Sequence, residues 1–154
     1  MTVETARLRL VPISNGELEA LIAREEDPEL KQAYSEMLQG CLREPEARLW
    51  HTVWYLERKT APGTVVGDLS FKGLNPDGSA ELGYGLRAGC CGCGYMTEAV
   101  RAVCTWAFAQ GAVRVEAETA PENTASQRVL ARAGFLPTGA VGEEGPRFAL
   151  FPPR

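Results

Sequence analysis

Apolar and polar side chains alternate over residues 5–12, near the start of the chain. Leu8 and Leu10 fall on one face of an extended segment, and Arg7 and Arg9 fall on the other. This period of two predicts a short strand with one buried face. Runs rich in β-branched and aromatic residues, bounded by turn residues, predict further strands over residues 49–59, 64–71, 79–87 and 113–118, with one or two more after residue 135.

Apolar residues at helical spacing separate the first strand from the next. Ser14 followed by Glu17 has the spacing of a capping box and predicts the start of a helix. Asp27 and Pro28 predict the start of a second helix, because proline fits the first helical position. We expect this second helix to end near Gly40.

A third helix, strongly apolar, is predicted after residue 94. Met96, Val100, Val103 and Ala107 recur at helical spacing, with further apolar residues beside them. We therefore expect this helix to lie against the sheet and to end at Gly111.

The order of the elements predicts the fold class. A last short helix is expected over residues 126–133, between an N-cap at Asn123 and a closing glycine at Gly134. Strands joined by short turns favour antiparallel pairing, whereas the strand–helix–strand unit over residues 80–118 favours a parallel pair. The chain is therefore predicted to be a mixed α+β protein.

Composition narrows the class of protein further. The 154 residues contain no repeat and no low-complexity linker, so we expect one domain over residues 1–154. The net charge of −4 argues against a nucleic-acid-binding protein, and no apolar run is long enough to predict a membrane span. Five cysteines without framework spacing, after a polar N-terminus, predict a cytoplasmic protein in a reducing compartment.

Residues 89–94, between a predicted strand and a predicted helix, read Gly-Cys-Cys-Gly-Cys-Gly. This loop is either a plain glycine-rich connection or an anion site, because its N–H groups and the helix N-terminus can converge on a pyrophosphate. A P-loop would need Gly-Lys-Ser/Thr, which is absent. A Rossmann site would need a third glycine, which is missing, although Glu116 or Glu118 falls at a suitable distance for a ribose contact. Coenzyme A is the third ligand that this geometry can hold.

A longer motif surrounds this loop. Leu82-Gly83-Tyr84-Gly85-Leu86 is followed, after five residues, by Gly92-x-Gly94-Tyr95-x-Thr97-Glu98-Ala99. These residues resemble the acetyl-CoA loop of the GNAT N-acetyltransferases, in particular the branch that includes the ribosomal-protein N-terminal acetyltransferases. Residues 5–10, 67–69 and 122–135 resemble the first strand, a middle strand, and the late helix with its following strand in that branch. The resemblance covers most of the chain, in order and at family spacing.

The resemblance implies a GNAT fold, with a central, mostly antiparallel and twisted sheet of six to seven strands and about four helices. It implies that a parallel pair of strands splays apart at the acetyl-CoA site. The implied activity is transfer of an acetyl group from acetyl-CoA to a primary amine by direct attack, with no metal. The acceptor would be a protein N-terminus or a small amine. We expect a monomer or a homodimer, with neither nucleic acid nor membrane as a partner.

The resemblance also implies where the cofactor binds. Its contacts would be Leu86, Cys91, Gly92, Cys93, Gly94, Tyr95, Met96, Thr97, Asn123 and Ser126. The family loop usually opens with Gln or Arg where this chain has Gly89, and its next positions tend to be aromatic and basic where this chain has cysteines. Backbone N–H groups are expected to hold the pyrophosphate, while a side-chain cation near the phosphates is lost.

Acetyl transfer to an amine needs a donor for the oxyanion and an acceptor for the amine proton. The resemblance places the thioester beside residues 81–86, so a backbone N–H near Leu86 would be the oxyanion donor. Alkyl amines are mostly protonated at neutral pH, and a carboxylate can take the proton directly or through water. Glu81 is the first candidate for this base and Glu118 the second; the alternative for both is a solvated charge at a strand end.

The leaving thiolate needs a proton. Ser126 matches the position proposed in this branch to protonate the thiolate or to bind the cofactor sulfur, and Asn123 could contact the pantetheine arm while capping the helix. Tyr84 and Tyr95 are the tyrosines nearest the motif and are alternative acids, although Tyr95 is expected to pack. A purely structural place in the first turn of the helix is the alternative for Ser126.

The cysteines support a rival hypothesis. Cys90 and Cys93 form a Cys-x-x-Cys at a predicted helix start, which is typical of thiol–disulfide redox proteins, although the surrounding strand order is not. A zinc site would need a further ligand from Cys41, Cys104 or His51, with no paired spacing in the sequence, and His51 is expected to be structural. A non-catalytic module that binds coenzyme A is the remaining alternative.

Overall fold

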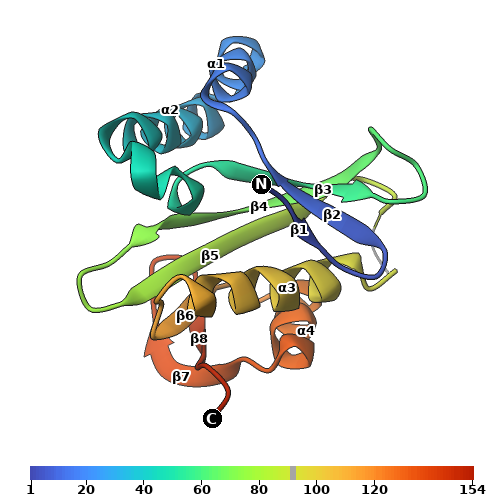
Figure 1. The fold of residues 1–154 in the computed structure, drawn as a ribbon. Coiled ribbons are helices and arrows are strands. Elements are labelled where there is room, and N and C mark those ends of the chain that lie inside the picture. Colours follow the sequence, from blue (N-terminus) through green and yellow to red (C-terminus); the bar gives the residue numbers. More distant parts are fainter. Residues whose placement is uncertain (91–92) are drawn as a thin grey trace.

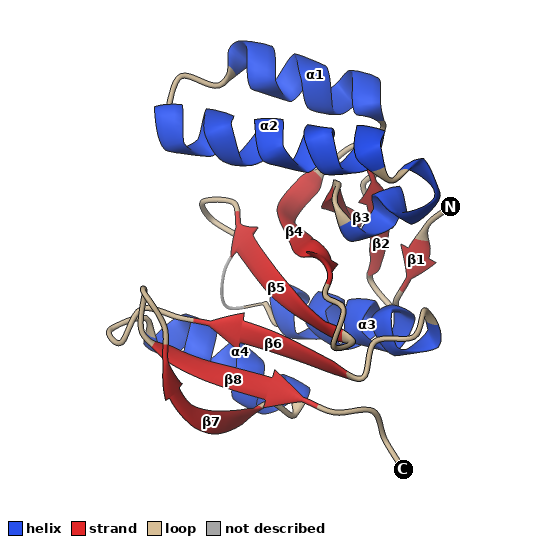
Figure 2. Cartoon of the chain, turned by 90° about the vertical axis from the view of Figure 1, so that its left-hand side faces the viewer, coloured by secondary structure: helices blue, strands red, loops and turns tan. Residues whose placement is uncertain are grey.

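The computed structural model describes residues 1–90 and 93–154. Within them, one sheet has the strand order β1-β2-β3-β4-β5-β6-β8-β7, with α1 and α2 on one side and α3 and α4 on the other (Figure 1). In the view turned by 90°, α1 and α2 lie together beside β2, β3 and β4 (Figure 2). The strands are β1 (Val3–Glu4), β2 (Leu8–Pro12), β3 (Val53–Arg58), β4 (Val65–Leu74), β5 (Ser79–Leu86), β6 (Arg114–Glu118), β7 (Leu136–Val141) and β8 (Pro146–Leu150).

Neighbouring strands are antiparallel except for β5 and β6, which are parallel. Pairing of β5 with β6 runs from Ser79 opposite Arg114 to Glu81 opposite Glu116. This confirms the mixed α+β fold and the parallel pair predicted over residues 80–118. The described sheet has eight strands rather than the expected six to seven, because the two-residue β1 was not predicted and the chain after residue 135 forms two strands, β7 and β8, where one or two were expected.

The helices begin where the sequence predicts them. Ser14 and Glu17 form the predicted capping box, and Asp27 accepts a hydrogen bond from the first turn of the second helix. That helix continues past Gly40 to Arg43. The helices are α1 (Asn15–Arg24), α2 (Pro28–Arg43), α3 (Tyr95–Ala109) and α4 (Thr124–Ala133), with a short 3-10 helix η1 (Pro45–Trp50).

The single strand predicted over residues 49–59 is shorter than expected. Trp50 ends η1, and β3 begins only at Val53. The Trp50 ring is buried against Phe71 and Trp106, with ring centroids 5.1 and 4.7 Å apart. Core packing of a large ring, rather than strand pairing, therefore explains the apolar residues at positions 49 and 50.

His51 links the end of α2 to η1. Its Nε2 lies 2.9 Å from Glu44 Oε1. A Cβ at Gly40 would overlap the His51 imidazole ring, so the glycine inside α2 permits a close approach rather than ending the helix. This arrangement agrees with the structural role expected for His51.

The helix α3 covers one face of the sheet. It buries Met96, Ala99, Val100, Val103 and Ala107, which confirms the apolar face predicted from the sequence. Because side chains alternate along a strand, the opposite face of β5 and β6 carries the remaining, mostly polar positions. A smaller apolar cluster of Ile13, Leu18, Cys41 and Val53 joins α1 and α2 to β2 and β3.

Candidate active site

The strands β5 and β6 stop pairing part of the way along β5. Their last register pair is Glu81 with Glu116, and β5 continues alone on that side to Leu86. Just beyond β5, the Arg87 N–H donates to the Val66 carbonyl of β4 at 2.8 Å. Because N–H directions alternate along a strand, the Leu86 N–H points to the opposite edge, into the gap.

A cavity of about 210 Å³ lies beside this gap. Its wall combines the end of β5, the first turn of α3 and one face of α4. The lining residues are Tyr84, Gly85, Leu86, Met96, Asn123, Ala125, Ser126 and Val129. The structure therefore brings together five residues that the sequence predicted separately: Tyr84, Leu86, Met96, Asn123 and Ser126.

Two hydroxyl groups meet at the wall of this cavity. Tyr84 Oη lies 2.8 Å from Ser126 Oγ and donates to the Ser126 carbonyl at 3.2 Å. Asn123 fixes the helix turn, because its Oδ1 accepts the Ser126 N–H at 3.1 Å. Burial raises the pKa of Tyr84, while its hydrogen bond with Ser126 opposes that rise. Both hydroxyl groups are thus protonated at neutral pH and close enough to exchange a proton.

Two further hollows continue from the cavity towards the surface. The next, of about 190 Å³, shares Leu86 and Met96 with the first and reaches Arg128 and Arg132 on α4. The third, of about 500 Å³, shares Arg132 with the second and is also lined by Arg7 and Arg101. Because consecutive hollows share lining residues, they form a path from the gap in the sheet to a group of arginines, of which Arg7 pairs with Glu98 in the outer hollow.

The N-terminus of α3 borders this path. Gly94 has a φ of +77°, a left-handed conformation that glycine adopts without strain, and Gly94 and Thr97 line both outer hollows. The Arg7 guanidinium lies 4.5 Å from the centre of the Tyr95 ring and donates to the Cys93 carbonyl at 2.8 Å. Tyr95 therefore packs, as expected. The predicted contacts Cys91 and Gly92 lie outside the described residues.

Sequence reasoning missed the arginines of the path. It expected the loop to have lost its cation near the phosphates, but Arg101, Arg128 and Arg132 stand beside the outer hollows from α3 and α4. The separation of Arg128 from Arg132 is one helical turn, so the pair on one face of a helix was a readable signal. Arg7 comes from the segment before β2, and only the tertiary fold brings it near.

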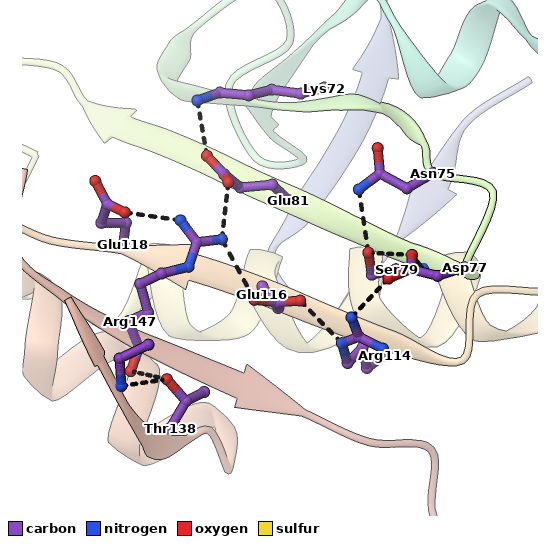
Figure 3. A network of polar contacts seen from close by, with 11 residues as sticks. Lys72, Asn75, Asp77, Ser79, Glu81, Arg114, Glu116, Glu118, Thr138 and Arg147 are labelled. Carbon is purple, nitrogen blue, oxygen red and sulfur yellow. Dashed lines mark hydrogen bonds and ion pairs between the residues drawn. The ribbon is translucent and has the colours of Figure 1, made fainter. Parts of the chain in front are cut away.

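Glu81, the first candidate base, lies in a network of ion pairs on the other face of the sheet (Figure 3). Lys72 Nζ is 2.7 Å from Glu81 Oε2, and Arg147 Nη2 is 2.9 Å from Glu81 Oε1. Burial alone would raise the pKa of Glu81, but the hydrogen bonds from Lys72 and Arg147 lower it below its ordinary value. Glu81 is therefore a firmly ionised carboxylate whose oxygens both have partners.

Glu118, the second candidate, belongs to the same network. Its Oε2 accepts the Glu144 N–H at 2.8 Å, and its Oε1 lies 2.7 Å from Arg147 Nη1. These bonds, the one from the Glu144 N–H first, lower the pKa of Glu118. Arg147 thus ties β8 to both β5 and β6 on the face opposite α3.

The cysteines are distributed between core and surface. Cys41 and Cys104 are buried, and burial raises the pKa of Cys104 to about 12. Cys90 is half-buried and Cys93 is exposed, on either side of the two residues that are not described. Among the described residues, no group of three or more His, Cys, Asp or Glu side chains is placed to hold a metal ion, and no helix is long and apolar enough to cross a membrane.

Comparisons with known proteins bear on this geometry. The sequence profile described as Acetyltransferase (GNAT) domain matches residues 7–136. No curated protein sequence matches the chain significantly.

Solved structures share the fold at low sequence identity. A ribosomal-protein-S5-alanine acetyltransferase from Vibrio fischeri has 18% identity and a TM-score of 0.75, over 98% of this chain and 96% of that chain. A ribosomal L7/L12 alpha-N-protein acetyltransferase, RimL, in complex with coenzyme A has 19% identity and a TM-score of 0.74, over 98% of both chains. An acetyl transferase from Salmonella typhimurium that modifies the N-terminal serine of ribosomal protein L7/L12 has 18% identity and a TM-score of 0.73, over 99% of this chain and 100% of that chain.

Proposed function

This chain belongs to the GNAT acetyltransferase family and is an acyltransferase, and we propose that it moves the acetyl group of acetyl-CoA onto a primary amine by direct attack. The single observation that carries the proposal is the continuous path from the gap between β5 and β6 to the arginines of α3 and α4. An apolar inner end and a cationic outer end match a thioester arm that ends in a phosphorylated nucleotide.

Each part of the path suits one part of the cofactor. The pyrophosphate would lie against the N-terminus of α3 at Gly94, Tyr95, Met96 and Thr97, because unpaired N–H groups and the helix dipole favour an anion there. Arg128 and Arg132 would neutralise the remaining phosphate charge. The pantetheine arm would run past Asn123 and Ser126 to the gap. A complex with coenzyme A among the structurally similar proteins supports this placement.

The inner end of the path suits the chemistry of the transfer. The Leu86 N–H points into the gap and would donate to the thioester oxygen as it becomes an oxyanion. When the amine nitrogen attacks and the C–S bond breaks, the thiolate needs a proton, which the Tyr84 and Ser126 hydroxyl pair can supply. Glu81 and Glu118, the bases proposed from the sequence, could act only through water, because their oxygens are held in ion pairs.

The proposed acceptor is a protein N-terminus or a small primary amine. Two of the similar structures are named for acetylation of ribosomal proteins, which supports the first choice. The acceptor would approach from the face of the sheet opposite α3, because α3 and α4 enclose the cofactor path on their own side.

Calorimetric titration with acetyl-CoA tests the cofactor half of the proposal. Arg128→Gln and Arg132→Gln should each weaken binding by roughly 10- to 150-fold, since a hydrogen bond to a charged group contributes roughly 1.5–3 kcal/mol. Arg9→Gln is the matched control, because the Arg9 side chain forms an exposed pair with Glu4 on the neighbouring strand β1. Equal affinity for all four proteins would contradict the path.

Turnover is tested by mass spectrometry of a panel of amines and N-terminal peptides incubated with acetyl-CoA and the protein. Mass detection is preferred over thiol reagents because the chain has cysteines of its own. Acetylated products support the transferase. Tight acetyl-CoA binding without any acetylated product would instead favour a non-catalytic binding module, and reductase activity that depends on Cys90 and Cys93 would favour the redox alternative.

A further inference from the structure

The face of the sheet opposite α3 carries an open strip beside the reactive gap. Ala80 and Leu82 of β5 are buried with α3, so the alternate residues Glu81, Gly83 and Gly85 face the other way. Within the described residues, no heavy atom other than chain neighbours lies within 4 Å of the position that a Cβ would take at Gly83 or at Gly85. The two glycines therefore leave room for a ligand directly behind the proposed thioester site.

Asp68 of β4 borders this strip. Its register partner on one side is Gly85 of β5, and its partner on the other is Tyr55 of β3. Residues directly opposite one another across strands project from the same face, so the Asp68 carboxylate lies on the face of the open strip. Among the described residues, no hydrogen bond or salt bridge involves the half-buried Asp68 carboxylate, in contrast to Glu81 and Glu118.

We propose that Asp68 binds the ammonium group of the acceptor and accepts the proton that the amine must lose before it attacks the thioester. This inference rests on the proposed function, and it assigns the base to a residue that the sequence analysis did not propose as a base. Three features lie close together and carry the inference. They are the unpaired Asp68 carboxylate on β4, the open glycine strip on β5 and the Leu86 N–H at the end of β5.

Distance favours Asp68 over Glu81. The Asp68 Cα lies directly across from Gly85, at about 5 Å in a paired antiparallel ladder. Glu81 is on the same strand as Gly85 but four positions away, about 13 Å at a strand's rise of roughly 3.3 Å per residue. A glutamate side chain spans only part of that separation, and both oxygens of Glu81 are held by Lys72 and Arg147.

The charges around Asp68 suit a base. Burial raises its pKa, and Arg87, beyond the end of β5, opposes that rise. Tyr34 faces it from α2, where burial and the Asp68 charge raise the pKa of Tyr34, and Glu25 and Arg24 at the end of α1 act on Tyr34 with opposite signs. A raised pKa of Asp68 is closer to the pKa of an amine. Proton transfer from the ammonium group to Asp68 therefore costs less free energy.

Two tyrosines also suit an ammonium ligand. Tyr55 is the cross-strand neighbour of Asp68, and both Tyr34 and Tyr55 pack against the apolar cluster under α1 and α2. Aromatic faces attract cations, as shown here by the Arg87 guanidinium, 5.8 Å from the centre of the Tyr55 ring. The site is therefore built for an aliphatic amine that arrives protonated, rather than for one that is neutral at pH 7.

The proton balance is complete within the reaction. The ammonium group transfers one proton to Asp68, and the neutral nitrogen forms a bond to the thioester carbonyl carbon. The tetrahedral intermediate expels the thiolate as the C–S bond breaks, and the second proton of the nitrogen passes to the hydroxyl pair of Tyr84 and Ser126, replacing the proton that this pair gives to the thiolate. The thiolate gains one proton through the hydroxyl pair of Tyr84 and Ser126, so one proton is released overall, from Asp68 to solvent.

Asp68→Asn tests the inference with two acceptors of different basicity. The probes are a short alkylamine, which is protonated at neutral pH, and an O-alkylhydroxylamine of the same length, which is not. We expect Asp68→Asn to lower kcat/KM for the alkylamine about 100-fold and to leave the hydroxylamine nearly unaffected. For the alkylamine, the acidic limb of the pH profile should also move from the pKa of Asp68 to the pKa of the amine, because Asp68→Asn can react only with amine that is already neutral.

Three controls separate the possible failures. Acetyl-CoA affinity and the unfolding midpoint of Asp68→Asn show whether the variant is folded, because the cofactor path lies on the other face. Glu57→Gln, on β3 opposite Arg9 of β2, should leave both acceptors unchanged. Equal losses for both acceptors would overturn the inference, as would an acidic limb that moves to the amine pKa in Glu81→Gln but not in Asp68→Asn. Wild-type protein that acetylates neither probe nor any panel amine would instead refute the proposed function.

Discussion

Arg147 is the centre of the ion-pair network, and its removal should destabilise the fold measurably. Its guanidinium contacts Glu81 at 2.9 Å, Glu116 at 3.3 Å and Glu118 at 2.7 Å. Arg147→Met keeps most of the side-chain length but removes the charge. Three carboxylates from two neighbouring strands would then face one another with one cation fewer, which favours separation of β5, β6 and β8.

The expected cost follows from the exposure of the partners. The side chains of Arg147 and Glu81 are 23% and 26% exposed. Exposed pairs contribute about 0–1 kcal/mol, whereas breaking a buried pair costs about 3–5 kcal/mol. We therefore expect Arg147→Met to lower the free energy of unfolding by about 2 kcal/mol at pH 7. For a chain of 154 residues, this corresponds to a fall of about 6 °C in Tm.

The loss should also depend on pH in a defined direction. The ion pairs hold the folded-state pKa of Glu81 below its unfolded value, which is about 4.3. Stability from a depressed carboxylate pKa is fully present above the unfolded pKa and is lost as the pH falls through the folded pKa. The difference between wild type and Arg147→Met should therefore shrink steadily as the pH is lowered below about 4.

Urea unfolding at several pH values between 7 and 3 measures this difference. Arg9→Met is the matched control, because Arg9 and Glu4 form an exposed pair, 42% and 50% exposed, whose loss should cost about 0–1 kcal/mol. A loss for Arg147→Met no larger than that of the control at pH 7 would refute the reasoning. So would a loss that stays constant from pH 7 to pH 3.

Three further predictions concern the site and the core. Gly67→Ala should cost about 1–3 kcal/mol in urea unfolding, because its Cβ would lie 2.5 Å from the Gly85 carbonyl oxygen; unchanged stability would contradict the close approach of β4 and β5. Tyr84→Phe should lower kcat roughly 100-fold with little change in acetyl-CoA affinity, and equal kcat would exclude Tyr84 as a proton donor. Cys104, buried and with a pKa of about 12, should be alkylated by iodoacetamide at pH 8 only as fast as the protein unfolds; rapid alkylation in the native protein, followed by peptide mass spectrometry, would contradict its burial.

Local patterns were sufficient to predict much of the fold. Alternation at Leu8 and Leu10, the capping box at Ser14 and the apolar face of α3 all have periods of two to four residues, so the sequence displays them directly. The strand order near residues 80–118 followed from the strand–helix–strand unit. The strand predicted at Trp50 was wrong, because a large apolar ring can be buried either from a strand or from a turn that faces the core.

The chemistry of the site depended on contacts that local patterns do not contain. Arg147 is 66 positions from Glu81, and their pairing changes Glu81 from an available base into a held carboxylate. Arg7 donates a hydrogen bond to the Cys93 carbonyl, although the two residues are 86 positions apart in the sequence. Asp68 is one acidic residue among many in the sequence, and only the register of β3, β4 and β5 shows that it faces the open glycine strip. Pairing across strands is set by topology, which residue spacing alone does not specify.

The account depends most on acetyl-CoA entering the gap between β5 and β6. A crystal structure of the acetyl-CoA complex measures this directly. We predict that the thioester oxygen lies within hydrogen-bonding distance of the Leu86 N–H, with the sulfur near Ser126 and the phosphates beside Arg128 and Arg132. A cofactor bound away from this path, or β5 and β6 closed together at Leu86, would contradict the account.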